Sequence, residues 1–105
     1  MSSPRRLIIA ANARSDIRGI LLHTVQRWGA TQRARYKTDI DATFALLLEH
    51  PSIGASREGL LPGIRAKPIG PRGQHIVYYR VEPAAIRILR VMHVKMDATG
   101  ELFDE

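Results

Sequence analysis

Basic side chains of the kind that could act on a phosphodiester gather in one stretch of this sequence, residues 73–97. Cleavage of RNA through its own 2′-OH needs a base, an acid and a cation for the phosphorane charge. The candidate set is Arg80, Arg87, Arg90 and His93. A second proton-transfer group is missing, because the chain ends in an acidic segment, 101–105, that would repel a phosphate backbone. The stretch is therefore interpreted as a docking surface, with ribonuclease chemistry as the alternative.

The remaining residues show no other catalytic, metal or cofactor motif. The chain has no cysteine, which excludes a disulfide framework and a thiolate nucleophile and fits a reducing cytoplasm. His23 and His50 have no second ligand at metal spacing, and no glycine loop could hold a phosphate. The apolar run at 7–11 is too short for a signal peptide or a membrane span. We expect a cytoplasmic protein without metal, cofactor or membrane contact.

The positive charge is concentrated in one half of the chain. Residues 57–95 hold eight basic and two acidic side chains, which accounts for the whole net charge of +6. Such a field favours an anionic partner, either nucleic acid, an acidic protein segment or a protein already bound to DNA, while simple solubility is the plainer explanation. The residues expected to contact a target are Arg65, Lys67, Arg80, Arg87, Arg90, His93 and Lys95.

Four strands are expected from runs of β-branched and aromatic residues. Residues 74–81 and 85–94 flank the short connection Glu82-Pro83-Ala84, which predicts two neighbouring antiparallel strands. Residues 5–10 predict a first strand and residues 64–69 another, while 51–63 predicts an irregular connection. Strict alternation would put Ile86, Ile88, Arg90 and Met92 on one face of the last strand, and Arg87, Leu89, Val91 and His93 on the other. Tyr78 and Tyr79 would then face opposite sides, one buried and one free to stack on a partner.

Two helices separate the first strand from the others. Apolar residues at three- and four-residue intervals predict a helix that Asn12 caps and that ends before Gly29. A second helix is expected over 31–49 with Thr31 as its cap, and the short connection makes the pair an antiparallel hairpin. Leu22 and Val25 lie off the apolar stripe of the first helix, so a partner could cover them.

The order of elements predicts one α+β domain over residues 1–105. Its architecture is β-α-α-β-β-β, a helical hairpin packed on one face of a mostly antiparallel four-stranded sheet. Both faces of the last strand carry apolar residues, so the face away from the helices should leave an apolar strip exposed beside arginines. This strip is a second candidate for partner binding.

Short motifs spread along the chain resemble the RelE/ParE superfamily of toxins from bacterial type II toxin–antitoxin systems, the ParE branch in particular. The motifs match in order over most of the chain and lie at 28–29, 32–36, 50–54, 62–65, 75–80, 88–93 and 96–97. The fold that this resemblance implies is the one reached above from the periodicity of the sequence. The sequence lacks the C-terminal tyrosine of RelE-type nucleases, which favours the ParE branch.

The resemblance implies a toxin that poisons DNA gyrase and is neutralised by a cognate ParD-like antitoxin, whose C-terminal segment folds as it binds. We expect a hetero-oligomer with the antitoxin, and contact with operator DNA only through the antitoxin. The antitoxin is expected at Leu22, Val25, Trp28, Leu60 and Leu61. Two alternatives remain open: a RelE-type ribosome-dependent mRNA endoribonuclease using Arg80, Arg87, Arg90 and His93, or a non-toxic homologue that only binds its antitoxin.

Overall fold

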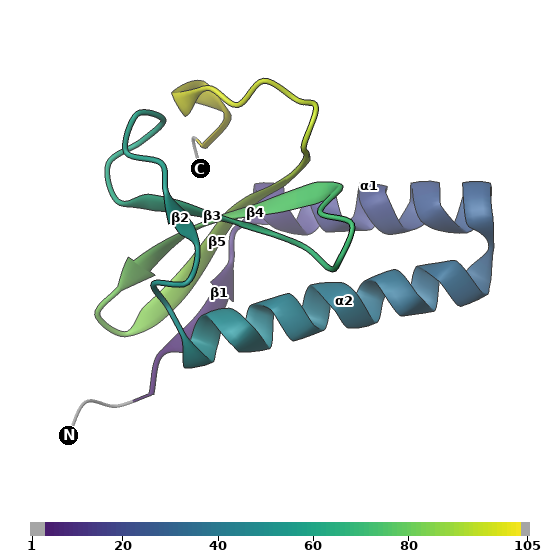
Figure 1. Ribbon diagram of the computed structural model, residues 1–105, viewed down its shortest axis with the longest axis horizontal. Coiled ribbons are helices and arrows are strands. Elements are labelled where there is room, and N and C mark those ends of the chain that lie inside the picture. Colours follow the sequence, from purple (N-terminus) through teal and green to yellow (C-terminus); the bar gives the residue numbers. More distant parts are fainter. Residues whose placement is uncertain (1–3, 104–105) are drawn as a thin grey trace.

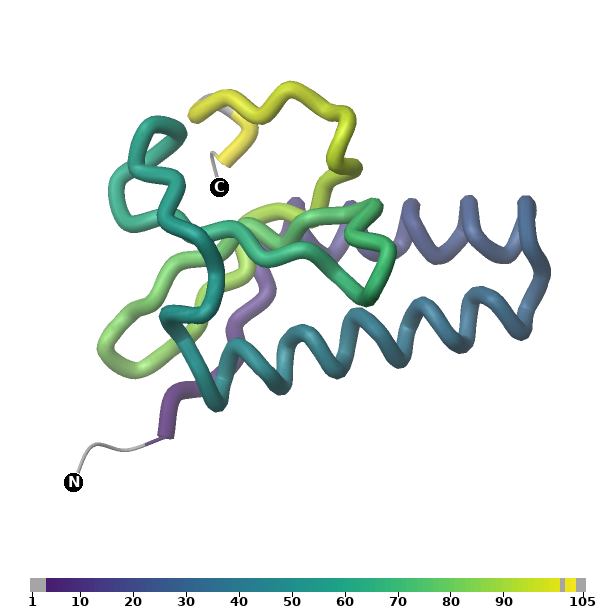
Figure 2. Tube along the Cα trace, viewed as in Figure 1, coloured from purple at the N-terminus to yellow at the C-terminus, as the bar shows by residue number. Residues whose placement is uncertain are grey.

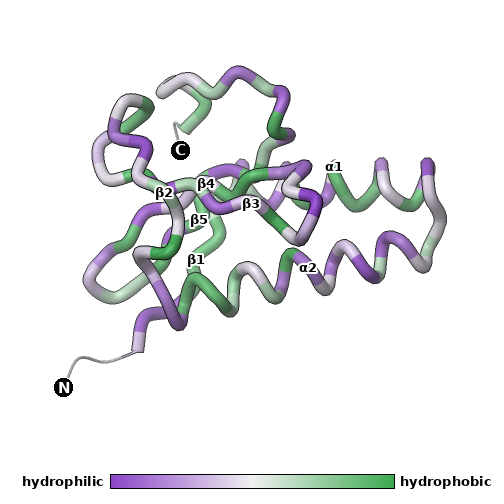
Figure 3. Tube along the Cα trace, viewed as in Figure 1, coloured by the Kyte–Doolittle hydropathy of each residue, from purple (hydrophilic) through white to green (hydrophobic). Residues whose placement is uncertain are grey.

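Two long helices cover one face of a five-stranded sheet in the computed structural model, which describes residues 4–103 (Figure 1). Helix α1 (Ala11–Trp28) and helix α2 (Ala30–Glu49) form the antiparallel hairpin that the sequence predicts. The hairpin runs beyond the sheet at its far end, where the two helices join. α2 is hydrophobic beside the sheet and hydrophilic toward the hairpin tip (Figure 3), and its buried residues all lie in its second half.

The sheet has the order β1-β5-β4-β3-β2. Its strands are β1 (Arg6–Ile9), β2 (Ala55–Ser56), β3 (Ile64–Pro68), β4 (His75–Glu82) and β5 (Ala85–His93). β1 pairs in parallel with β5, and the other pairs are antiparallel. The predicted α+β class and helical hairpin are confirmed, with one strand more than expected. The additional strand β2 has only two residues, which is too short to leave a periodic pattern in the sequence.

The helix starts differ from the sequence predictions by one or two residues. α1 begins at Ala11 with Ala10 as its N-cap and no side-chain cap hydrogen bond, so the prediction that Asn12 caps it is wrong. The cause is the sheet, because the Ala10 N–H donates to the Ile88 carbonyl and keeps Ala10 extended. α2 begins directly after Gly29, whose φ of +92° is a conformation that favours glycine. Gly29 thus ends one helix and starts the next, and Thr31 lies inside the second.

The main core lies between the helices and the sheet. Val77, Tyr79, Ile86, Ile88 and Val91 project from β4 and β5 toward the helices and are almost completely buried. The helices contribute Ala13, Leu21, Ile40, Phe44 and Leu47 to the same cluster. These helix residues lie on the apolar faces that the three- and four-residue spacing predicts. Trp28 continues the spacing on α1 but lies exposed beyond the sheet.

A second, smaller core covers the face of the sheet away from the helices. The C-terminal segment folds back over this face and ends in a short 3₁₀ helix, η1 (Gly100–Phe103) (Figure 2). Phe103 packs on Tyr78 with ring centroids 5.2 Å apart, and Leu102, Leu60 and Leu61 join them. The prediction of an exposed apolar strip and of one exposed tyrosine in the pair 78–79 is therefore wrong, since both tyrosines are buried.

A bulge in β5 breaks the alternation expected for that strand. Tyr78 lies opposite Arg90 but Tyr79 lies opposite Ile88, which leaves Leu89 as the extra residue. Past the bulge the side chains exchange faces, so that Val91 packs with Ile88 against the helices. Met92 instead packs with Leu89 under the C-terminal segment. The two predicted sides of β5 are correct before the bulge and wrong after it.

The bulge also places Arg90 against helix α1. The Arg90 guanidinium donates two hydrogen bonds to the Asp16 carboxylate, at 2.7 and 2.8 Å, and a third to the Leu102 carbonyl at 2.8 Å. Asp16 also accepts the Val91 N–H at 2.9 Å. Only 18% and 15% of the two side chains is exposed, so the pair is largely desolvated. One ion pair thereby joins α1, β5 and the C-terminal segment.

Replacing Asp16 should destabilise the fold more than replacing an exposed aspartate. We expect Asp16→Ala to lower the free energy of unfolding by about 2–3 kcal/mol, because it leaves a half-buried guanidinium without its carboxylate. Asp41→Ala, which removes the exposed pair with Lys37, is the matched control and should cost less than about 0.5 kcal/mol. Urea titrations followed by circular dichroism measure both. Equal losses in the two variants would contradict the assigned role of Asp16.

Candidate functional site

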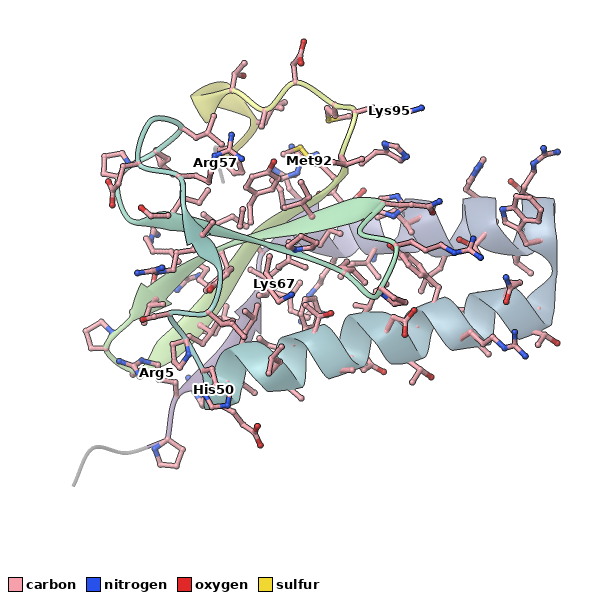
Figure 4. All side chains as sticks on the ribbon, in the orientation of Figure 1. Arg5, His50, Arg57, Lys67, Met92 and Lys95 are labelled. Carbon is pink, nitrogen blue, oxygen red and sulfur yellow. The ribbon has the colours of Figure 1, made fainter. Side chains whose placement is uncertain are left out.

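The basic residues of the β4–β5 hairpin divide between its two ends. Arg80 and Arg87 lie opposite each other near the connection between the strands. His93 and Lys95 lie at the other end, about 20 Å farther along β5 at the usual rise per residue. In Figure 4, Arg5, which binds the Glu82 carbonyl, lies at the lower left, and Lys95 lies above the far side of the sheet. The residues predicted to contact a target therefore do not form one surface.

Two arginines bind one carboxylate at the connection between β4 and β5, and two more lie on the strand and segment beside it. Arg87 donates to Glu82 at 2.9 Å and Arg80 at 3.2 Å, while Arg5 donates to the Glu82 carbonyl at 2.9 Å. Exposed Arg6 lies opposite Ala85 in the parallel pair. The hydrogen bond from Arg87, and less strongly that from Arg80, lowers the pKa of Glu82, which stays ionised at neutral pH. We name Arg5, Arg6, Arg80 and Arg87 the cationic end.

Arg65 and Lys67 lie on the other side of the sheet. Lys67 pairs with Val77 and Arg65 with Tyr79, both of which face the helices. The Arg65 guanidinium donates to the carbonyls of Ser52 and Gly54 at 3.2 and 2.7 Å. It therefore holds the loop that follows α2.

The Tyr79 hydroxyl binds the same loop from beneath. It donates to the Pro51 carbonyl at 2.7 Å and accepts the Gly54 N–H at 2.8 Å, and burial raises its pKa. A Cβ on Gly54 would come within 2.6 Å of this hydroxyl, so the position requires glycine. These contacts are structural, and no pattern in the sequence indicates them.

The residues of the ribonuclease alternative do not converge. Arg80 and Arg87 share Glu82, and Arg90 is bound by Asp16 and the Leu102 carbonyl. His93 lies at the far end of the strand, where its Nδ1 accepts the Lys95 N–H at 3.1 Å. Arg90 and His93 line one groove together with two other histidines. Arg80 and Arg87 lie at the opposite end of the hairpin, so the four residues of this set do not meet at one point. The arrangement suits binding better than catalysis.

A polar cluster that sequence reasoning missed connects α2 with both strands of the hairpin. The Tyr36 hydroxyl lies 2.6 Å from His75 Nδ1, and the His75 ring meets that of His93 edge to face at 5.2 Å. Burial, and to a lesser extent Asp39, raises the pKa of Tyr36 to about 12. Burial also lowers the pKa of His75, helped by the nearby charges of His93 and His23. Tyr36 and His75 are 39 positions apart, so the signal for this pair is tertiary.

The residues expected to bind an antitoxin also fall into two groups. Leu22 and Trp28 are 56% and 62% exposed on α1, and Val25 between them is half-buried. The Arg27 guanidinium lies 5.1 Å from the centre of the Trp28 ring. Leu60 and Leu61 are half-buried against the second core, on the opposite side of the sheet. Only the α1 group is an open apolar surface.

Comparison with known proteins identifies the family. A family model described as the ParE toxin of the type II toxin–antitoxin system, parDE, matches residues 7–98. The chain belongs to this family. The recognition of the ParE branch from the sequence motifs is thereby confirmed.

Curated relatives and a solved structure agree with this assignment. The chain is 35% identical to the toxin ParE1 of Caulobacter vibrioides over 94 residues, which covers 90% of this chain and 94% of the relative. It is 28% identical to the toxin ParE1 of Mycobacterium tuberculosis over 98 residues, which covers 92% and 97%. A structure described as the chromosomal ParDE TA system from P. aeruginosa superposes with a TM-score of 0.75 at 26% identity, covering 88% of this chain and 98% of that one.

The described part of this ParE chain has neither a metal-binding cluster nor a membrane-spanning helix. No group of three His, Asp or Glu side chains among residues 4–103 is arranged to hold a metal ion. Neither helix in that range is apolar enough over its length to cross a membrane. The candidate functional regions of this ParE chain are three: the cationic end, the exposed face of α1 and the region around the histidines.

The buried His75 should make the stability of this ParE chain depend on pH. Its pKa is lower in the folded state, so as pH falls through about 6.5 the unfolded chain binds a proton that the folded chain does not. Stability should therefore decline between pH 7 and 5.5, by less than about 1.4 kcal/mol per pH unit for one proton. The depressed pKa of Glu82 acts in a lower window, below about pH 4.3.

Urea titrations at several pH values measure this decline. His75→Phe should flatten the profile between pH 7 and 5.5, whatever its overall stability, because it removes the titrating group. His50→Gln changes an exposed histidine after α2 and should leave the profile as it is. A wild-type profile that is flat over this window would show that burial of His75 has no energetic effect.

Proposed function

We propose that this ParE chain acts in the cytoplasm by binding DNA gyrase and trapping it with cleaved DNA, without an enzymatic activity of its own. The observation that carries the proposal is the placement of the basic residues. Arg80 and Arg87 share Glu82 at one end of the hairpin. Arg90, paired with Asp16, and His93 lie in the groove at the other end. Membership of the ParE family supports a toxin, and the separated cations support binding in place of catalysis.

The cationic end is the surface we propose for contact with the target. Two arginines share one carboxylate there and two more lie beside them, so a positive charge remains after Glu82 is satisfied. Arg80 and Arg87 keep 37% and 27% of their side chains exposed despite that pairing. A surface of this kind attracts an acidic protein region or a protein that already holds DNA, and its effect weakens with salt. Arg65 and Arg90 are left out of this surface, because their guanidinium groups are bound to the chain's own carbonyls and to Asp16.

Charge reversal at the cationic end should weaken inhibition of gyrase. Purified wild-type protein should stop gyrase supercoiling and accumulate cleaved DNA. The double variant Arg6→Glu with Arg80→Gln should need about tenfold more protein for the same effect, because it removes three units of charge from the attracting surface. The matched control, Arg33→Glu with Arg35→Gln, makes the same change on the exposed part of α2 near the hairpin tip and should behave as wild type.

Two outcomes would reject this proposal. Normal supercoiling at a large molar excess of folded wild-type protein would exclude gyrase as the target. Cleaved transcripts on translating ribosomes, lost in His93→Ala, would establish the ribonuclease alternative. Circular dichroism of every variant shows that a loss of effect does not come from unfolding.

We also propose that a ParD-like antitoxin neutralises this chain by covering the exposed face of α1. The family description and the ParDE structure support an antitoxin partner. Leu22, Val25 and Trp28 offer it an apolar surface at helical spacing, which suits an amphipathic segment that folds as it binds. Leu60 and Leu61 are omitted, because they already pack against the C-terminal segment. In the resulting hetero-oligomer, operator DNA would be contacted only through the antitoxin.

A charge on the exposed face of α1 should weaken antitoxin binding. We expect Leu22→Glu to raise the Kd for the cognate antitoxin about 30-fold, the loss typical of an apolar anchor at the centre of an interface. Leu48→Glu makes the same change at an exposed leucine of α2 and serves as the control. Isothermal titration calorimetry measures both. Unchanged affinity in Leu22→Glu would move the antitoxin site elsewhere.

A further inference from the structure

A groove of about 390 Å³ lies between α1 and the ends of β4 and β5. Helix α1 lines it with Gly19 and His23, the strands with His75 and His93, and the segment after β5 with Met96. Met96 is half exposed, and a Cβ on Gly19 would meet no atom within 4 Å, so the helix side of the groove is open. It is separate from both the cationic end and Trp28 at the hairpin tip.

Asp16 is the only carboxylate among residues 4–103 that lines this groove, and it is already hydrogen-bonded within the chain. Asp16 accepts two hydrogen bonds from Arg90 and one from the Val91 N–H, so its oxygens are occupied. The other ionisable groups of the lining are the three imidazoles and the paired Arg90. The groove therefore lacks an available acidic group and holds several groups that can become positively charged.

The hydrogen bonds inside the cluster orient two of the imidazoles. With a pKa of about 12 the Tyr36 hydroxyl keeps its proton at neutral pH, and we assign it as the donor to His75 Nδ1. The Lys95 N–H donates to His93 Nδ1. Each ring then carries its proton on Nε2 when neutral, so both imidazoles have an N–H donor left for a ligand.

We propose that this groove binds a carboxylate side chain of a partner peptide, with neighbouring aliphatic side chains lying on Gly19, Ile20 and Met96. The imidazole N–H groups provide hydrogen-bond donors for the carboxylate. The apolar lining provides contact area for aliphatic side chains, which a peptide has and a phosphate backbone lacks. The proposal concerns the chemistry of the ligand, and it holds whichever partner supplies the peptide and whatever the cellular target is.

The site should bind its ligand more tightly as pH falls. A carboxylate among the imidazoles favours their charged form. In the peptide-free protein that form is disfavoured at His75 by burial and, less strongly, by the charges of His93 and His23. The charged and titratable groups that face this cluster are Asp16 and His23 from α1, Tyr36 and Asp39 from α2, His75 from β4, Arg90 and His93 from β5, and Lys95 after it. Asp16 is already paired with Arg90, so the protons taken up when the peptide binds go to the imidazoles.

Two blocked peptides that differ by one group test the proposal. The probe is Ac-Leu-Glu-Leu-Leu-NH2, and the control Ac-Leu-Gln-Leu-Leu-NH2 replaces the carboxylate by an amide of the same shape. Each is titrated into the full chain to about 5 mM, enough to occupy most of a site with a Kd near 1 mM. The imidazole Hε1 resonances of His23, His75 and His93 are followed by NMR at several pH values, with His50 as an internal reference.

The expected result is a shift of the groove histidines by the acidic peptide alone, with a raised pKa for at least one of them and an unmoved His50. No shift, or equal shifts with both peptides, would overturn the proposal. A short oligothymidylate that moves the same resonances at lower concentration would also overturn it, in favour of nucleic acid.

Two variants make the assignment specific to the groove. Gly19→Leu fills the open helix side and, as a helix former in place of glycine, should not harm folding, yet it should weaken binding at least about tenfold. His93→Gln keeps a hydrogen-bond donor but removes the charge, so the gain in affinity at low pH should shrink. Unchanged binding in both variants would place the peptide elsewhere and overturn the proposal.

Discussion

The ion pair between Arg90 and Asp16 is the contact on which the arrangement of this protein depends. It joins helix α1 to the bulged part of β5, and through the Leu102 carbonyl it holds the C-terminal segment over the second face of the sheet. A largely desolvated guanidinium tolerates burial only with a full set of acceptors, and three are present here. The pair thereby fixes Arg90 in the wall of the groove and neutralises the charge of the most central arginine of the hairpin.

The other arginines of the sheet are arranged by the same requirement for partners. Arg80 and Arg87 lie directly opposite each other, an unfavourable placement that the carboxylate of Glu82 makes acceptable. One carboxylate cannot neutralise them together with Arg5 and Arg6, so the excess charge stays at that end of the molecule. The protein thus concentrates positive charge at one end of the sheet and keeps Arg80 and Arg87 there, away from His93. This separation of the candidate nuclease residues is the physical basis for proposing a binding toxin.

The surfaces available to partners are set by what the chain covers with its own residues. The C-terminal segment and the loop with Leu60 and Leu61 bury the second face of the sheet. The two most exposed large apolar side chains among residues 4–103 lie on α1. Leu22 and Trp28 lie on the exposed side of that helix, while Gly19 and His23 line the groove beside β5. A ParE chain of this shape can therefore contact an apolar segment and an acidic side chain from the same helix, at a distance from the cationic end.

The sequence alone determined the two helices, the four longer strands and their order, because helical spacing, Gly29 and the short β4–β5 connection act locally. It also determined the family, through short motifs kept in order along the chain. Only the tertiary structure decided where the charges and cavities lie. One extra residue in β5 reversed the faces beyond Leu89, and that shift took Arg90 to Asp16 and Met92 beneath the C-terminal segment. The contact between Tyr36 and His75 likewise joins residues far apart in the chain, since no local pattern encodes which side chains a bulge and a helix crossing bring together.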